Sequence, residues 1–199
     1  TYYAYNNLNQ LASSTTNGAD TTYAYDDNGN LFDNMHYRYQ WNEENFMTGV
    51  QDSIIYTPIV DYIYDSFGNR FQRIHYDEDG KTDYQTRYYF DGINILMEQT
   101  KVANGNWQTS DSYTLGSGVV GHIISDHLAN GTDLFYHYDP IGNVLMISNA
   151  SGDSIASYCQ EGFGNVKQTI GSADNNYHLT TKEIDSNTGL YYFYARWYD

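Results

Sequence analysis

The sequence predicts an all-β protein in which consecutive hairpins form one extended antiparallel sheet that curls or spirals. Three observations predict this fold: a strand–turn–strand motif recurs along the chain, tyrosine supplies 23 of the 199 residues, and 17 glycines stand against only 2 prolines. Tyrosine suits such a sheet because its ring packs while its hydroxyl reaches water or a polar partner. Aliphatic stripes with helical spacing are missing from the sequence, which argues against a helix bundle.

The clearest copy of the motif spans residues 23–31, YAYDDNGNL. Tyr23 and Tyr25 are two positions apart, so both side chains fall on one face of a strand. An acidic residue and the pair Gly29-Asn30 come next, and these are the residue types of a tight turn. An apolar residue then begins the return strand. Each copy is therefore a predicted β-hairpin.

Further copies vary this motif along the chain. They span 3–11 and 37–47, which lack the glycine, 62–70 and 136–144, which are close to ideal, 158–166, which has glutamine in place of the second tyrosine, and the partial copy 89–92. We expect the repeat aromatics to pack the wall of the sheet: Tyr23, Tyr25, Tyr37, Tyr39, Trp41, Tyr62, Tyr64, Tyr136, Tyr138 and Tyr158. We expect a second set to shape the turns: Gly29, Asn30, Gly68, Asn69, Gly142, Asn143, Gly164 and Asn165. Such repetition indicates an array in which each unit buries a face against its neighbours.

The ordered copies and two further stretches resemble the YD-repeat (Rhs) family, which includes bacterial Rhs toxins, toxin-complex shell components and the teneurin ectodomain. Residues 179–199, LTTKEIDSNTGLYYFYARWYD, are similar to the signature that closes a bacterial Rhs core. Residues 113–121, YTLGSGVVG, are similar to a segment shortly before that end. The resemblance implies a single repeat domain over 1–199, with the core-associated end signature at 172–199, in a hollow β shell around a C-terminal cargo.

The resemblance also implies a continuation of the polypeptide beyond such a core. In the family, a self-cleavage site and a variable toxin come after it. The sequence stops at Asp199, which is similar to the Asp that opens this continuation. We therefore expect the cleavage residues and any toxin to lie outside these 199 residues.

The charge of the chain is strongly negative, with 25 acidic residues against 9 lysines and arginines and a formal net charge of -16. This balance disfavours nucleic-acid phosphates and anionic membrane surfaces, which need clusters of basic residues. No stretch approaches the ~18 apolar residues that a membrane-spanning helix needs. The single cysteine, Cys159, rules out an internal disulfide framework. We expect no nucleic-acid partner and no membrane span.

Two glycine-rich stretches match nucleotide-binding motifs only in part. Residues 116–121, GSGVVG, fit G-x-G-x-x-G, but the next segment is short and β-branched instead of helical. Gly80-Lys81-Thr82 resembles the end of a phosphate-binding loop, but the required earlier glycine falls at His75. We interpret both as bends between strands.

Two polar clusters are also weak candidates for chemistry. Asp26, Asn28 and Asn30 have the spacing of a calcium loop, but the sixth position is not glycine. Residues 122–127 bring two histidines and an aspartate together, but no G-x-S-x-G elbow accompanies them. We therefore expect no catalytic residues, no metal site and no cofactor.

These inferences favour a non-enzymatic structural module of a secreted or cell-surface bacterial protein, which forms a tyrosine-rich β wall. Two alternatives stay open: a self-assembling extracellular filament joined by edge-strand pairing, and a glycan- or receptor-binding adhesion module. The expected partners are other copies of the chain, the remainder of a longer Rhs shell, or glycans. The aromatic end strand is the predicted assembly edge, with Tyr191, Tyr192, Phe193, Tyr194, Trp197 and Tyr198.

Overall fold

The protein is all-β, and a long antiparallel sheet dominates it. The computed structural model describes residues 1–117, 122–173, 175–194 and 196–198. Its largest sheet has 14 strands in the order β17-β16-β15-β14-β13-β12-β11-β10-β9-β8-β7-β6-β5-β4, so that each strand lies beside its neighbour in sequence. The predicted fold class, a sheet of consecutive antiparallel hairpins, is confirmed.

The strands succeed one another with short connections. Their bounds are β1 Tyr2–Tyr5, β2 Leu11–Thr16, β3 Ala19–Thr22, β4 Ala24–Tyr25, β5 Leu31–Asp33, β6 Tyr37–Trp41, β7 Met47–Asp52, β8 Pro58–Tyr64, β9 Arg70–Tyr76, β10 Thr82–Asp91, β11 Asn94–Val102, β12 Gln108–Leu115, β13 Ile123–Leu128, β14 Asp133–Tyr138, β15 Val144–Ser148, β16 Ser154–Gln160, β17 Val166–Gly171, β18 Tyr191–Phe193 and β19 Arg196–Tyr198. A short 3-10 helix, η1, covers Leu179–Thr181. Strands β1 to β3 form a separate three-stranded sheet, and β18 pairs with β19.

The chain divides into two compact units. Unit 1 comprises residues 1–63 and 73–83, and unit 2 comprises residues 64–72 and 84–199. In unit 1 the buried apolar side chains come from β6, β7 and β8, and in β8 they occupy alternating positions, as the period of a strand requires. They are Tyr39, Met47, Val50, Val60 and Tyr62.

Two repeat aromatics of unit 1 donate hydrogen bonds from their polar atoms to the backbone of neighbouring strands. The Tyr25 hydroxyl donates to the Leu11 carbonyl oxygen at 3.0 Å. The indole N–H of Trp41 donates to the carbonyl oxygen of Leu31 at 2.7 Å. These rings therefore pack and satisfy a partly buried backbone group at the same time.

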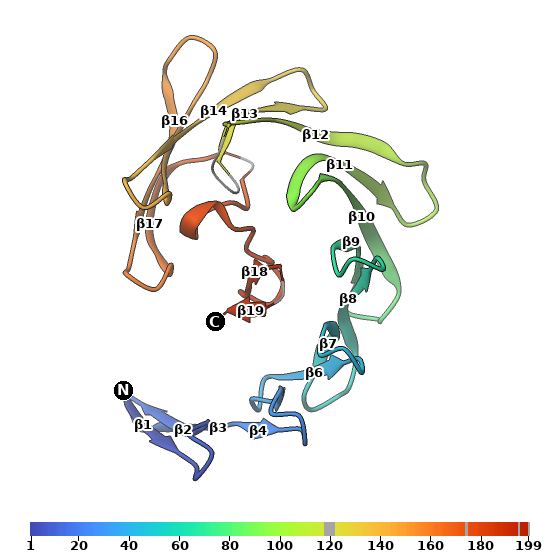
Figure 1. Ribbon diagram of the computed structural model, residues 1–199, viewed down its shortest axis with the longest axis vertical. Coiled ribbons are helices and arrows are strands. Elements are labelled where there is room, and N and C mark those ends of the chain that lie inside the picture. The colour runs from blue at the N-terminus through green and yellow to red at the C-terminus, as the bar shows by residue number, and fades with distance from the viewer. Residues whose placement is uncertain (118–121, 174, 195, 199) are drawn as a thin grey trace. The chain divides into compact units, whose positions relative to one another are not determined.

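Unit 2 contains the start of β9, most of β10, strands β11 to β17 and the C-terminal segment. Figure 1 shows η1, β18 and β19, in orange to red, inside the curve that β11 to β17 make. The core lies on this inner face, and it consists of Ile123, Leu134, Tyr136, Val144, Ile147, Ala156, Tyr158 and Tyr177. The last of these, Tyr177, comes from the C-terminal segment, so that segment completes the core.

An aspartate holds the turn in the copies at 23–31, 62–70 and 136–144. In the copy at 62–70, one carboxylate oxygen of Asp65 accepts from the backbone N–H groups of Phe67 and Asn69, at 2.8 and 2.9 Å. The Asn69 amide donates to the other oxygen at 3.0 Å, and Gly68 has a φ of 83°, which favours glycine. Burial acts to raise the pKa of Asp65, but these hydrogen bonds outweigh it and hold the pKa below its usual value.

The turn geometry predicts the effect of removing this carboxylate. We expect Asp65→Ala to lower the free energy of unfolding by about 1 kcal/mol, because the turn loses hydrogen bonds to a charged acceptor. The depressed pKa gives stability that is present above the ordinary aspartate pKa and lost as the pH falls through the lower folded value, so the difference should shrink in acid. Urea unfolding at neutral and acidic pH measures both effects.

The matched control for this prediction is Asp65→Asn. Asn42 and Asn149 stand at the same place in other turns and accept the same pair of backbone hydrogen bonds. The amide variant should therefore keep most of the stability at neutral pH. An alanine variant as stable as the amide variant would contradict this account of the turn.

Candidate functional site

The C-terminal segment is fastened to the turns of the repeat. We call the described residues 175–194 and 196–198 the tail, and the residues of unit 2 that contact it the tail seat. In the turn after β14, the Thr181 hydroxyl donates to the Gly142 carbonyl oxygen at 3.0 Å. In the turn after β16, the Tyr191 hydroxyl donates to the Gly164 carbonyl oxygen at 2.8 Å. The backbone N–H of Arg70, just after a third turn, donates to the Tyr192 hydroxyl at 3.2 Å.

Two of the turn glycines leave room for the tail as well as shaping the turn. Gly142 and Gly164 have φ values of 89° and 91°. A Cβ on Gly164 would lie 2.8 Å from the side chain of Leu179, which is closer than carbon atoms approach. A Cβ on Gly142 would lie 3.0 Å from the ring of His122 and 3.9 Å from the tail at Thr180. The sequence indicated turn geometry for these glycines, and the structure adds the close approach of the tail.

A buried ion pair joins the tail to the wall. The Arg70 guanidinium, at the start of β9, pairs with the Glu183 carboxylate of the tail, and the two residues are 1% and 4% exposed. The Tyr88 hydroxyl of β10 donates to the second Glu183 oxygen at 3.0 Å. The guanidinium also lies over the rings of Tyr88 and Tyr192, 4.5 and 4.3 Å from their centroids. Such a pair needs its hydrogen bonds and ring contacts to offset the cost of taking both charges out of water.

A second, partly buried carboxyl group lies on β11. One oxygen of Glu98 accepts hydrogen bonds from the hydroxyls of Tyr113 and Tyr177, at 2.8 and 2.9 Å. The two rings meet edge to face, with centroids 5.5 Å apart. Burial, the charge of Glu183 and the charge of Asp111 raise the pKa of Glu98 to about 8, against the lowering effect of the two hydroxyls.

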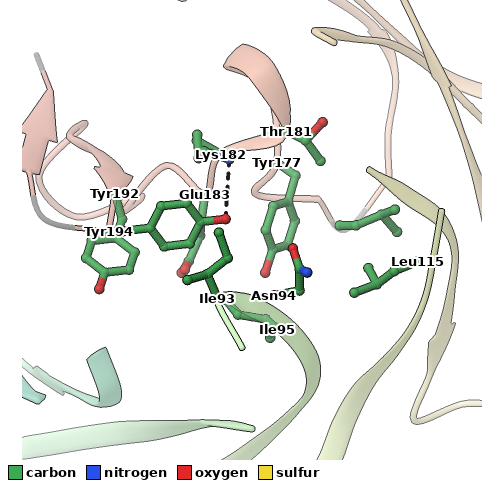
Figure 2. A pocket seen from close by; sticks show the side chains of 11 residues that line it. Ile93, Asn94, Ile95, Leu115, Tyr177, Thr181, Lys182, Glu183, Tyr192 and Tyr194 are labelled. Carbon is green, nitrogen blue, oxygen red and sulfur yellow. Dashed lines mark hydrogen bonds between the residues drawn. The ribbon is translucent and has the colours of Figure 1, made fainter. Parts of the chain in front are cut away.

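A small cavity lies beside these groups. Figure 2 shows Ile93, Asn94 and Ile95 on one side, and Tyr177 and Lys182 of the tail on the other. Its volume is about 30 Å³, which is room for about one or two water molecules. The Lys182 ammonium is 3.5 Å from the Tyr194 hydroxyl and 4.8 Å from that ring centroid, and burial lowers the pKa of Lys182.

The other predicted repeat aromatics are distributed over both units. In unit 2, Tyr136 and Tyr158 are buried, and the Tyr138 hydroxyl bonds to the backbone of Ile123 while its ring stacks on His122 at 4.8 Å. The Tyr64 hydroxyl accepts from the indole N–H of Trp197 at 3.3 Å. In unit 1, the Tyr23 hydroxyl bonds to that of Ser14 at 3.1 Å, and the rings of Tyr37 and Tyr39 meet edge to face.

Part of the predicted assembly edge is paired within the chain, while β19 has no second partner strand among the described residues. Strand β18 pairs with β19 on one side, and Tyr191 bridges to Ile184 on the other. Tyr191 and Tyr192 are 3% and 4% exposed. The reason is that the aromatic side chains of this segment pack on the wall of unit 2, which the sequence of the segment alone does not reveal.

The weak motif candidates have local structural roles where the structure describes them. The second half of the G-x-G-x-x-G match, 118–121, lies outside the described residues. Asp26 and Asn30 bond to each other within their turn, and the His127 ring bonds to Asp133 at 2.7 Å. The described residues contain no group of three or more histidine, cysteine or acidic side chains that could hold a metal ion. That part of the chain also holds no helix with the length and apolar character to cross a membrane.

Sequence comparison relates the chain to named nucleases. It is 34% identical to the tRNA3(Ser)-specific nuclease WapA of Bacillus spizizenii and 35% identical to the tRNA(Glu)-specific nuclease WapA of Bacillus subtilis subsp. natto, over 98% of this chain in each case. The chain spans only 8% of the length of these relatives. No protein-family model matches it.

Structural comparison supports the shell-type fold. The crystal structure of TcdB2-TccC3 matches 99% of this chain with a TM-score of 0.65 at 15% identity, over 12% of its own chain. The Photorhabdus luminescens Tc holotoxin pore matches 99% with a TM-score of 0.68 at 16% identity, over 11% of its own chain. The chain therefore has the β fold of these toxin-complex chains, as the resemblance to YD-repeat proteins predicted.

The comparisons overturn two expectations. The names of the relatives contradict the expectation of a purely structural, non-enzymatic protein, and they contradict the exclusion of a nucleic-acid partner. The exclusion rested on the net charge of 199 residues. That net charge describes only the residues included in the count, and the relatives are much longer than this segment.

The raised pKa of Glu98 predicts a pH dependence of stability. A folded-state pKa above the unfolded value gives stability that is present below the unfolded pKa and lost as the pH rises through the folded pKa. For Glu98 this window runs from about 4.5 to about 8. We expect Glu98→Gln, which stays neutral, to remove this fall and to be more stable than the wild type at the upper end. Thermal unfolding across the window measures it, with the exposed Glu78→Gln as control. Parallel pH profiles for the wild type and Glu98→Gln would contradict the assignment.

The buried ion pair predicts a strong coupling between its partners. We expect Arg70→Met to cost about 3–5 kcal/mol, because the Glu183 carboxylate is left buried without its counter-charge. The double variant Arg70→Met/Glu183→Met should be more stable than the sum of the two single variants. Denaturant unfolding of the four proteins gives the coupling energy. Additive losses would mean that the two charges do not act as a pair.

Proposed function

We propose that the chain is part of a tRNA-cleaving nuclease toxin and forms the segment of its β shell that fastens the tail on the inner side of the wall. The observation that carries the proposal is the match of 98% of the chain to proteins named as tRNA nucleases. The nuclease activity and the tRNA substrate belong to the whole polypeptide in this proposal.

The tail seat supports the more specific part of the proposal, which is the place of the chain in the shell. It ties the segment that carries the core-associated end signature, 172–199, to three repeat turns and to β10 and β11. A polypeptide that continues beyond such a tail would start from the inner side of unit 2. We therefore assign the chain to the C-terminal end of an Rhs-type core that forms a single repeat domain.

The charge of the chain fits this role. A nuclease that binds RNA needs a basic surface, because phosphate contacts dominate its affinity. A wall with a net charge of -16 attracts such a basic surface and repels tRNA. The same imbalance that disfavours RNA binding by this segment favours the holding of an RNA-binding cargo.

We also propose that the complete polypeptide is exported from a bacterial cell. One of the structural neighbours is the Photorhabdus luminescens Tc holotoxin pore. A toxin that acts on tRNA in another cell must leave the cell that makes it. The expectation of a secreted protein is therefore part of this proposal.

The proposal predicts that the complete polypeptide cleaves tRNA and that the tail seat restrains this activity. We expect purified polypeptide to release tRNA fragments on a denaturing gel. Glu183→Gln should raise the initial rate by on the order of tenfold, because it leaves Arg70 without its counter-charge and weakens the seat by several kcal/mol.

The matched control is Glu161→Gln. Its carboxylate also pairs with a basic side chain, Lys167 at 2.9 Å, but both groups are about half exposed, so the rate should not change. A polypeptide that leaves tRNA intact would refute the nuclease assignment. Equal rates for the wild type and Glu183→Gln would refute the restraining role of the seat.

A further inference from the structure

Strand β17 is the terminal strand of the part of the sheet that lies in unit 2. It pairs with β16 and has no second strand beside it among the described residues. Five of its six residues, 167–171, are exposed, and Ile170 is 62% exposed. Figure 1 shows β17 at the end of the run of strands that begins with β10. An edge of this length offers a row of backbone N–H and C=O groups to another strand.

A cleft opens beside this edge, and an unsatisfied histidine lies in it. The cleft has a volume of about 460 Å³ and is lined by residues of β16, β17 and the tail, among them Tyr158, Thr169 and His178. His178 is 8% exposed, and its Nδ1 atom is buried without a hydrogen-bond partner among the described residues. Burial lowers the pKa of His178 to about 4, so the ring is neutral and one nitrogen can accept a hydrogen bond.

A row of tyrosines on alternate strands leads to this cleft. Tyr113 of β12 meets Tyr177 of the tail edge to face. Tyr136 of β14 donates its hydroxyl to Asn175 at 3.2 Å. Tyr158 of β16 meets the ring of His178 edge to face, with centroids 4.7 Å apart. The next position in this row would lie on a strand beyond β17, opposite the cleft.

We infer that β17 pairs with one more antiparallel strand of the repeat type, supplied by another part of the same, longer polypeptide, and that a tyrosine of this strand enters the cleft and bonds to His178. The chain spans 8% of the length of its relatives, so further strands of this type are available in such a polypeptide. A second copy of the chain is a poorer source. In the 14-stranded sheet of a second copy, the tyrosine strands β12, β14 and β16 are paired on both sides, and the other terminal strand, β4, has only two residues. Its exposed tyrosine strand β1 lies in a separate sheet and, with four residues, is shorter than the six-residue β17.

The inference depends on the proposed function only because it requires a longer polypeptide. Its test does not measure tRNA cleavage. A photo-crosslinking benzoylphenylalanine replaces Thr169 in the complete polypeptide, and mass spectrometry identifies the attached peptide after irradiation. We expect an intramolecular crosslink to a segment with the Tyr-x-Tyr pattern. The control places the same group at Ile124, which is 51% exposed on β13 between two paired strands, and should give no crosslink to a strand.

Each other outcome overturns the inference. A crosslink between two molecules would assign β17 to an intermolecular contact, and crosslinks to the tail alone, or none, would leave β17 as a free edge. The variant His178→Phe tests the tyrosine contact, because it keeps a ring against Tyr158 without a hydrogen-bonding nitrogen. We expect the Thr169 crosslink yield to fall about fivefold in this variant. An unchanged yield would remove His178 from the site, provided that hydrogen exchange of β18 shows the tail still in place.

Discussion

The arrangement of unit 2 depends on a buried ion pair, in which two opposite charges compensate each other away from water. Arg70 and Glu183 are 113 residues apart in sequence and fully enclosed. Desolvation of such a pair is costly, so its stability relies on the Tyr88 hydroxyl and on the aromatic rings around the guanidinium. These groups come from β9, β10 and the tail, and removal of either charge alone would leave the other one buried without its partner.

The repeat turns gain a second role through this arrangement. Their acidic residues and glycines close each hairpin locally, and their carbonyl oxygens at Gly142 and Gly164 then accept hydrogen bonds from the tail. Thr180 and Thr181, which make the contacts around Gly142, have φ values of 44° and 56°. Such values are unfavourable for β-branched residues, so the surrounding contacts must hold this part of the tail in place.

The local part of the structure could be predicted from the sequence, and the long-range part could not. Strand alternation and Gly-Asn turns depend on residues a few positions apart, so the hairpins and their order can be deduced from the pattern. The seat depends on pairs such as Tyr177 with Glu98, 79 residues apart, for which no sequence signal exists. The burial of Tyr191 and Tyr192 could not be deduced from the sequence either, because the wall that covers them is distant in sequence. The exclusion of a nucleic-acid partner is a different error, since it extends a charge count to a protein much longer than the segment.

The turns at the two ends of the strands in unit 2 differ in how much change they can accept. At Gly142 and Gly164 an added carbon atom would meet His122 or the tail. At Gly131 and Gly152, in the turns at the opposite ends of the strands, an added carbon atom would meet nothing within 4 Å. Insertions and grafted loops should therefore be accommodated after β13 and β15, where the surface is open. The turns that contact the tail have little such freedom. During evolution, changes in the length and chemistry of the wall should therefore concentrate in the turns after β13 and β15.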